Sequence, residues 1–230
     1  MFGANVKRQM YGTISGVTRT QRTYRGIPAE ERRALRRAAL LEAGLELLGT
    51  TGWQSATVRA VCTLAGLNDR YFYENFTDRD ALLLAVVDDQ AAQGTSAILD
   101  AAAHAPREIA EIARASTSAT LDFLTEDPRR AHILGHEFPA HPLLQQRRGE
   151  IIRTLSGFFT AQTRDLVGDA TLSDTDLSLT AFTLTAGLWD LTAAWLRGDV
   201  PISRDHLADY TVALLLTTAD LAAPLHRRLT

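Results

Sequence analysis

Residues 57–76, TVRAVCTLAGLNDRYFYENF, decide the fold. Thr57 is of a type that caps helix N-termini and Gly66 is of the type that ends helices, so the first half predicts a helix of about two turns. Asn68 can cap a second short helix over residues 69–75, directly after the glycine link. Two short helices joined by a glycine turn are typical of a helix-turn-helix.

Longer helices are predicted on both sides of this motif. The upstream helix is predicted to begin at Pro28 and to end near residues 51–52. Its expected apolar stripe consists of Ala34, Ala38, Leu41, Leu45 and Leu48. The downstream helix is predicted to begin at Asp78 and to run to a break at 104–106, which would link an N-terminal head to a larger body. Further helices are predicted over residues 107–124, 128–137, 142–167, 174–197 and 204–222.

The composition also favours an all-α fold. The 230 residues include 35 Ala and 33 Leu against only 9 Val and 9 Ile, a balance that favours helix over sheet. The net charge of −3 hides an asymmetry: residues 1–80 hold 12 basic and 8 acidic side chains, and residues 81–230 hold 12 and 19. A basic head on an acidic body indicates that the head contacts a polyanion.

Cysteine usage and hydropathy exclude several classes of protein. The single cysteine, Cys62, cannot form an internal disulfide, and no cysteine cluster could hold zinc or an iron–sulfur centre. No apolar run approaches the ~18 to 20 residues that a membrane span needs, and the opening residues do not resemble a signal peptide. We therefore expect a cytoplasmic protein with no cofactor and no membrane partner.

Four consecutive stretches resemble the DNA-binding domain of the TetR family of bacterial transcriptional regulators. They are LLEAGLELLGTTGW (40–53), TVRAVCTLAGL (57–67), NDRYFYENF (68–76) and TDRDALLLAVVD (77–88). The resemblance implies a homodimer whose recognition helices enter successive major grooves of a palindromic operator. It also implies that a small effector binds the C-terminal domain and releases the DNA. The effector's identity does not follow from it.

The recognition helix is expected over residues 69–75. Phe72 and Phe76 are four residues apart and should face inward, which turns their neighbours outward. Among the outward residues, Arg70 suits guanine, Asn75 suits adenine, and Glu74 suits the amino group of cytosine. The residues expected at the DNA are Thr57, Arg59, Arg70, Tyr71, Tyr73, Glu74, Asn75 and Arg79.

Thr57 and Arg59 should meet phosphate near a helix N-terminus. The resemblance implies backbone contacts for Tyr73 and Arg79, although exposed charge and half-buried packing are the alternatives. Asp69, Arg70 and Tyr71 depart from the residues most frequent in the family, so the operator should not be inferred from relatives.

The resemblance also suggests how the chain divides. Residues 1–26 form a flexible basic extension, residues 27–80 the helix-turn-helix DNA-binding domain, and residues 81–230 the helical effector-binding and dimerisation domain. The extension could follow a minor groove or the phosphate backbone, or it could be only a disordered tail.

A ligand pocket is expected in the body, where aromatic and polar side chains lie on helices that should converge. The candidate lining residues are Phe123, His132, His136, Phe158, Phe159, Phe182, Thr185 and Trp189, although aromatic residues at helical spacing are more often plain core. His132 and His136 share a helix face, yet the following residues do not form an HExxH motif, so no metal is expected.

A dimer interface is predicted from a heptad-like seam in the helix over 174–197, together with the last helix. Its expected residues are Leu177, Ala181, Leu184, Leu188, Leu191, Trp195, Leu207, Tyr210, Leu214 and Leu221. The alternative is that these side chains form the internal core of a monomer.

We expect no enzyme, because the sequence has no GxSxG elbow, no Walker loop and no GxGxxG motif. The prediction from sequence is therefore a ligand-responsive DNA-binding regulator, most simply a repressor. One alternative is an effector-independent DNA-binding or protein-interaction module whose body only dimerises or recruits a partner. Another is an all-α enzyme with a vestigial head.

Overall fold

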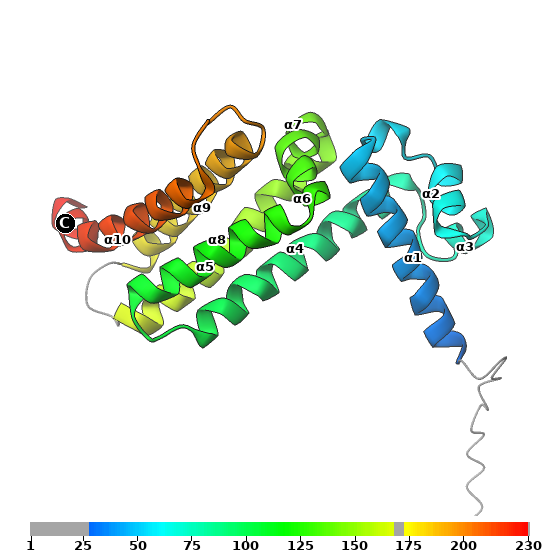
Figure 1. Cartoon of the computed structure of the whole chain (residues 1–230). Coiled ribbons are helices and arrows are strands. Elements are labelled where there is room, and N and C mark those ends of the chain that lie inside the picture. Colours follow the sequence, from blue (N-terminus) through cyan, green and yellow to red (C-terminus); the bar gives the residue numbers. More distant parts are fainter. Residues whose placement is uncertain (1–27, 168–172, 230) are drawn as a thin grey trace, which may run out of the picture.

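The computed structural model describes residues 28–167 and 173–229, and every regular element in these ranges is a helix (Figure 1). The head contains α1 (Ala29–Thr50), the 3-10 turn η1 (Trp53–Ser55), α2 (Val58–Ala65) and α3 (Asp69–Tyr73). The body contains α4 (Arg79–His104), α5 (Ile109–Glu126), α6 (Pro128–His132), the π-helical turn η2 (Ile133–Glu137), α7 (Phe138–Ala140), α8 (Pro142–Val167), α9 (Asp174–Leu196) and α10 (Arg204–Leu229). The all-α fold expected from the sequence is confirmed.

Local caps build the head as the sequence predicts. The Thr57 hydroxyl accepts a hydrogen bond from the Ala60 N–H at 3.1 Å, and the Asn68 side chain accepts one from the Tyr71 N–H at 3.2 Å. Gly66 ends α2 with φ of +65°, a conformation that costs glycine nothing because it has no Cβ. The two short helices of the helix-turn-helix therefore begin at the predicted residues.

The core of the head is built mainly from α1, α2, α3 and the first turns of α4. Its most deeply buried side chains are Leu40, Leu48, Val61, Phe72, Leu82, Leu83 and Val86. Burying a large apolar side chain of this kind stabilises the fold by about 1.5 to 3 kcal/mol. The expected stripe on α1 is wrong at its start: Ala34 and Ala38 are exposed, because the buried face of α1 begins only at Leu40.

The body is a bundle of long helices that extends away from the head (Figure 1). In it α4 packs on α5 and α8, α10 packs on α5, and α9 packs on α8. The short segment α6–η2–α7 lies where the body meets the end of α1. No described helix is long and apolar enough to cross a membrane.

Some helix ends differ from the sequence prediction. α3 ends at Tyr73, two residues early, because the Phe72 carbonyl accepts both the Asn75 and the Phe76 N–H and closes a turn. The helix predicted over 128–137 divides into α6 and a π-helical turn. The last helix continues to Leu229 instead of ending near residue 222, so it accommodates the lost N–H donor and the ring of Pro224.

Gly66 offers a direct test of the turn between α2 and α3. A Cβ there would meet nothing within 4 Å, so Gly66→Ala should cost only the positive-φ strain, about 1 to 2 kcal/mol. The control is Gly157→Ala on the exposed side of α8, which also has open space and should gain about 0.5 to 1 kcal/mol. The measurement is the urea midpoint at unchanged m-value; equal midpoints for the two variants would contradict the assignment of the turn.

Candidate functional site

One surface of the head presents the outward side of α3 and the start of α2. Thr57, Arg59 and Arg70 are exposed, and Tyr73 has 60% of its surface exposed. The guanidinium of Arg79 lies 5.3 Å from the ring of Trp53, which holds it at the start of α4. These side chains lie around a helix-turn-helix and combine positive charge with hydroxyl groups.

Glu74 is paired within the head. Its carboxylate lies 3.0 Å from Nε of Arg70 and 4.0 Å from the guanidinium of Arg36. The guanidinium of Arg36 also lies 4.5 Å from the centre of the Tyr71 ring, and Arg33 donates to the Glu74 carbonyl at 3.1 Å. Arginines in the first half of α1 therefore hold the end of α3 in place. Sequence reasoning missed this contact, although the run of arginines in α1 was an available signal.

Asn75 lies beyond the end of α3, where its side-chain amide donates to the Tyr71 carbonyl at 2.8 Å. In helix-turn-helix proteins it is the N-terminal part of the recognition helix that contacts base edges. Arg70 and Tyr71 lie in the first turn of α3, whereas Glu74 and Asn75 lie at and beyond its end.

Cys62 is buried inside the head, with 3% of its surface exposed. Burial raises the pKa of its thiol to about 11, and the nearby carboxylate of Asp69 acts in the same direction. The thiol is therefore protonated at neutral pH, and it belongs to the core.

The body contains a cavity of about 520 Å³, partly open to solvent, between α4, α5, α8, α9 and α10. Five of the eight candidate pocket residues line it, namely Phe123, Phe158, Phe159, Thr185 and Trp189. The cavity's size falls in the usual range for small-molecule sites, ~300 to 1,000 Å³.

Three candidate pocket residues do not line this cavity. His132 faces Glu137, with 3.6 Å between Nε2 and Oε1, and the exposed His136 lies beside it with 5.0 Å between the ring centres. Phe182 follows Ala181 on α9 and so faces away from the cavity, with 44% of its surface exposed. In residues 28–167 and 173–229, no three His, Cys, Asp or Glu side chains gather where they could share a metal ion.

The cavity wall is mainly apolar. Several of its threonines donate to carbonyls of their own helices, as Thr185 does to Ala181 at 2.7 Å and Thr120 does to Ser116 at 2.8 Å. Their hydroxyl protons are thus already used, so they offer methyl groups and oxygen lone pairs to an occupant.

Charge lies at the two ends of the cavity. Arg130, on α6 beside the head, donates to the side-chain oxygen of Gln90 and to the carbonyl of Phe123, both at 3.0 Å. At the other end, Arg164 pairs with Asp174 and holds the pKa of that carboxyl below its ordinary value. An amphipathic molecule would find an apolar wall between two charged ends.

The structure places most of the expected dimer seam inside the subunit. Leu177, Ala181, Leu184 and Leu188 line the cavity. Trp195 donates its indole N–H to the Ile202 carbonyl at 2.9 Å, while Leu207 has only 1% of its surface exposed. Leu191 and Leu214 are half-buried, and of the predicted residues only Tyr210 and Leu221 are at least half exposed.

A different apolar face of the last two helices is exposed. On α9, Leu179 and Phe182 are 61% and 44% exposed; on α10, Tyr210, Leu221 and Leu225 are 50%, 55% and 39% exposed. Sequence reasoning missed Leu179, Phe182 and Leu225 as interface candidates. The available signal was that these helices are apolar on more than one side, which indicates a second packing partner. The heptad steps predicted only the side that faces the interior of the subunit.

Comparison with known proteins identifies the head. Residues 40–86 match the family model described as bacterial regulatory proteins, tetR family. The search of curated proteins gives no significant match.

Solved structures with the same fold cover most of the chain. The fatty acid degradation regulator FadR from Bacillus halodurans superposes with a TM-score of 0.66 at 15% identity, over 79% of this chain and 94% of its own. FadR from Bacillus subtilis, solved in complex with stearoyl-CoA, gives 0.60 at 17% identity, over 77% and 96%. A TetR-like transcriptional regulator from Rhodococcus sp. RHA1 gives 0.60 at 16%, over 84% and 98%. The head thus matches the model described as bacterial regulatory proteins, tetR family, and the described chain shares its overall fold with solved regulators of the TetR type.

Proposed function

We propose that the protein is a ligand-responsive repressor that binds a palindromic operator as a homodimer and is released by an effector with a long apolar chain. The observation that carries the proposal is the continuity of α4, whose first turns complete the core of the helix-turn-helix and whose later turns line the cavity. The head is taken as residues 27–80 and the body as residues 81–230, with α4 crossing the boundary. The basic extension over residues 1–26 lies outside the described residues, and its contact with DNA stays a prediction.

In this proposal the head binds DNA through the exposed side of α3 and the start of α2. Arg70 and Tyr71 read bases in the major groove, while Thr57, Arg59, Tyr73 and Arg79 contact phosphates. Glu74 orients Arg70 and Arg36 instead of reading cytosine, because its carboxylate already pairs with both arginines.

The effector is proposed to carry a long acyl chain. The cavity wall is mainly apolar, and the Bacillus subtilis FadR that shares this fold was solved with stearoyl-CoA. An acyl chain would lie against Phe159, Thr185 and Leu188, and a polar group would meet one of the charged ends. The occupied cavity would alter α4, and with it the separation of the two recognition helices.

The dimer is proposed to form through the exposed apolar face of α9 and α10. Leu179, Phe182, Tyr210 and Leu221 are large side chains that remain exposed on one subunit. Two helices from each subunit would bury them in a four-helix bundle.

Glu74→Gln separates the two roles considered for this carboxylate. Removing a negative charge near the DNA backbone should raise affinity for duplex DNA by about 0.5 to 1 kcal/mol, or roughly twofold to fivefold. Loss of a cytosine contact would instead lower affinity for the operator by about 1 to 3 kcal/mol. The readout is fluorescence anisotropy on a site selected from random duplexes, and Glu111→Gln, in a similarly exposed pair with Arg114 on α5, is the control.

Phe182→Glu should convert the dimer to a monomer at micromolar concentration and weaken operator binding by at least about 100-fold, because one of two half-site contacts is lost. The measurements are mass by light scattering and anisotropy on the same sample. Ala103→Glu, on the exposed side of α4, is the control and should remain dimeric. A dimeric Phe182→Glu protein with full affinity would refute this interface.

Stearoyl-CoA should lower operator affinity by about 10-fold or more, the usual range for coupled sites. Thr185→Phe, which projects a larger side chain into the cavity, should weaken stearoyl-CoA binding about 10-fold and leave operator affinity within twofold of the unchanged protein. Both quantities are measured by titration calorimetry and anisotropy. A protein that binds the operator but no acyl compound would support the effector-independent module instead.

A further inference from the structure

We infer that two consecutive arginines on α6, Arg129 and Arg130, form the joint through which an occupant of the cavity acts on the head. The inference rests on the proposed function and deepens it, since it names the residues that couple the effector site to the DNA-binding domain. It adds a direct route from α6 to α1 beside the connection through α4.

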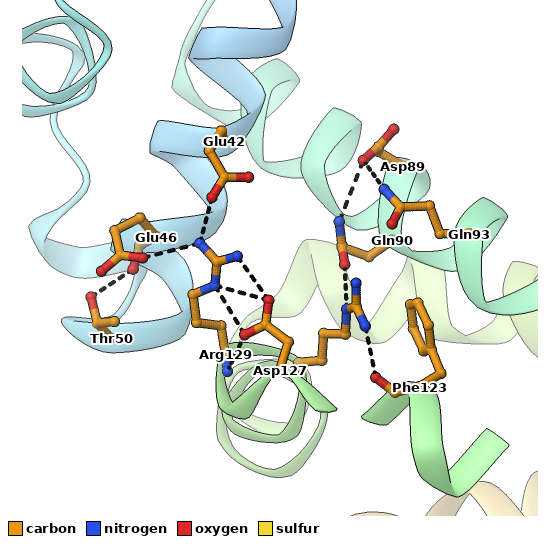
Figure 2. Close-up of polar contacts among 10 residues, drawn as sticks. Glu42, Glu46, Thr50, Asp89, Gln90, Gln93, Phe123, Asp127 and Arg129 are labelled. Atoms are coloured by element: carbon orange, nitrogen blue, oxygen red, sulfur yellow. Dashed lines mark hydrogen bonds and ion pairs between the residues drawn. The ribbon is translucent and has the colours of Figure 1, made fainter. Parts of the chain in front are cut away.

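Arg129 attaches α6 to α1 (Figure 2). One terminal nitrogen, Nη1, donates to the carboxylate of Glu42 at 2.7 Å and to that of Glu46 at 3.0 Å, both on α1. The other side of the guanidinium donates to Asp127 at 2.8 to 3.1 Å, and Asp127 also caps α6 by accepting the Arg129 N–H at 3.0 Å. One guanidinium therefore joins three carboxylates across the contact between head and body.

Within this cluster, Arg129 and Asp127 are partly shielded from water and strengthen each other's charge. The side chains of Arg129 and Asp127 are only 21% and 17% exposed. Hydrogen bonds from Arg129 lower the pKa of Asp127 below its ordinary value, while the carboxylates raise the pKa of Arg129. The stability from this pairing is complete above the ordinary pKa of Asp127 and is lost only as the pH falls through the lowered value. The pairing of Asp127 with Arg129 is thus intact at neutral pH and holds the guanidinium in place beside Glu42 and Glu46.

Close backbone packing makes the joint stiff. A Cβ built on Gly49 of α1 would lie 2.3 Å from Cβ of Arg129 and 2.8 Å from its Cα, so only glycine fits there. A second link comes from η2, where a carboxylate oxygen of Glu137 accepts the Trp53 N–H at 3.4 Å. At Gly49 the two helices are in direct backbone contact, so a shift of α6 toward α1 at this point must move the end of α1.

Arg130 brings the same turn of α6 into the cavity wall. Its guanidinium lies 4.0 Å from the centre of the Phe123 ring and donates to the Gln90 side chain and the Phe123 carbonyl, and all three residues line the cavity. Gln90 lies on α4 beside Asp89 and Gln93 (Figure 2), with Gln93 donating to Asp89 at 2.8 Å. An occupant that displaces Phe123 or Gln90 changes the contacts of Arg130, and the adjacent Arg129 transmits the change to Glu42 and Glu46.

The test compares DNA release in the full-length protein and in Arg129→Gln, with stearoyl-CoA as the probe. Arg129→Gln should bind stearoyl-CoA and operator within about threefold of the unchanged protein, while the probe's effect on operator affinity falls from about 10-fold to about twofold. The double variant Glu42→Ala/Glu46→Ala removes the same bonds from the side of α1 and should behave alike. The control is Arg148→Gln, whose partner Asp190 joins α8 to α9 at similar arginine exposure, 24%, and which should release DNA normally.

If both joint variants release DNA as the unchanged protein does, the inference is wrong while the proposed function stands. If stearoyl-CoA does not release DNA from the unchanged protein, the proposed effector is wrong. The coupling through Arg129 and Arg130 is then tested without a ligand, by amide hydrogen exchange. Arg130→Gln should then accelerate amide exchange over residues 42–53 by at least about threefold. The double variant Arg129→Gln/Arg130→Gln should exchange there no faster than Arg129→Gln alone. Acceleration confined to α4 and α5 would overturn the inference.

Discussion

The structure depends on one helix that belongs to both of its halves. α4 is capped by Asp78, whose carboxylate accepts the Ala81 N–H at 2.7 Å, and its first turns bury Leu82, Leu83 and Val86 in the core of the head. α2 and α3 are 8 and 5 residues long, and helices this short do not persist alone in water. Their geometry therefore comes from packing with α1 and α4, and the head moves as a unit when α4 moves.

A head held by one helix could still rotate about that helix. The Arg129 cluster and the Glu137–Trp53 contact supply attachments at a second place, the end of α1. Breaking a partly buried Arg–carboxylate cluster at one partner leaves a charge without compensation, which is costly. Head and body are thus coupled at two points, and both points adjoin the wall of the cavity through Gln90 and Arg130.

Local features of the fold were predictable from sequence, and features that depend on tertiary packing were not. The caps at Thr57, Asn68 and Asp78 use side chains and N–H groups three residues apart, so short-range chemistry fixes them. The heptad steps through Leu184 and Leu188 predict a dimer face, whereas the structure shows these residues in the cavity lining. A helical step of three and four residues cannot distinguish the two, because a cavity and an interface both require apolar side chains.

The polar contacts of the candidate site were equally hidden from sequence reasoning. The outward position of Glu74 predicts a base contact, whereas in the structure its carboxylate lies beside Arg36, 38 residues earlier in the chain. Arg129 pairs with Glu42 and Glu46 across more than 80 residues of sequence, and no periodicity signals such a contact. The aromatic residues that line the cavity were easier to predict, since Phe123, Phe159 and Trp189 lie on helices that must converge in a bundle.

The most direct test of the account is the affinity of stearoyl-CoA for the free protein and for the protein bound to its selected DNA site, measured by calorimetry under the same salt conditions. Coupled sites are reciprocal, so the account predicts that the DNA-bound protein binds the acyl compound more weakly, by the same factor by which the compound weakens DNA binding. Equal affinity for the free and DNA-bound protein would contradict the claim that the cavity and the head are coupled.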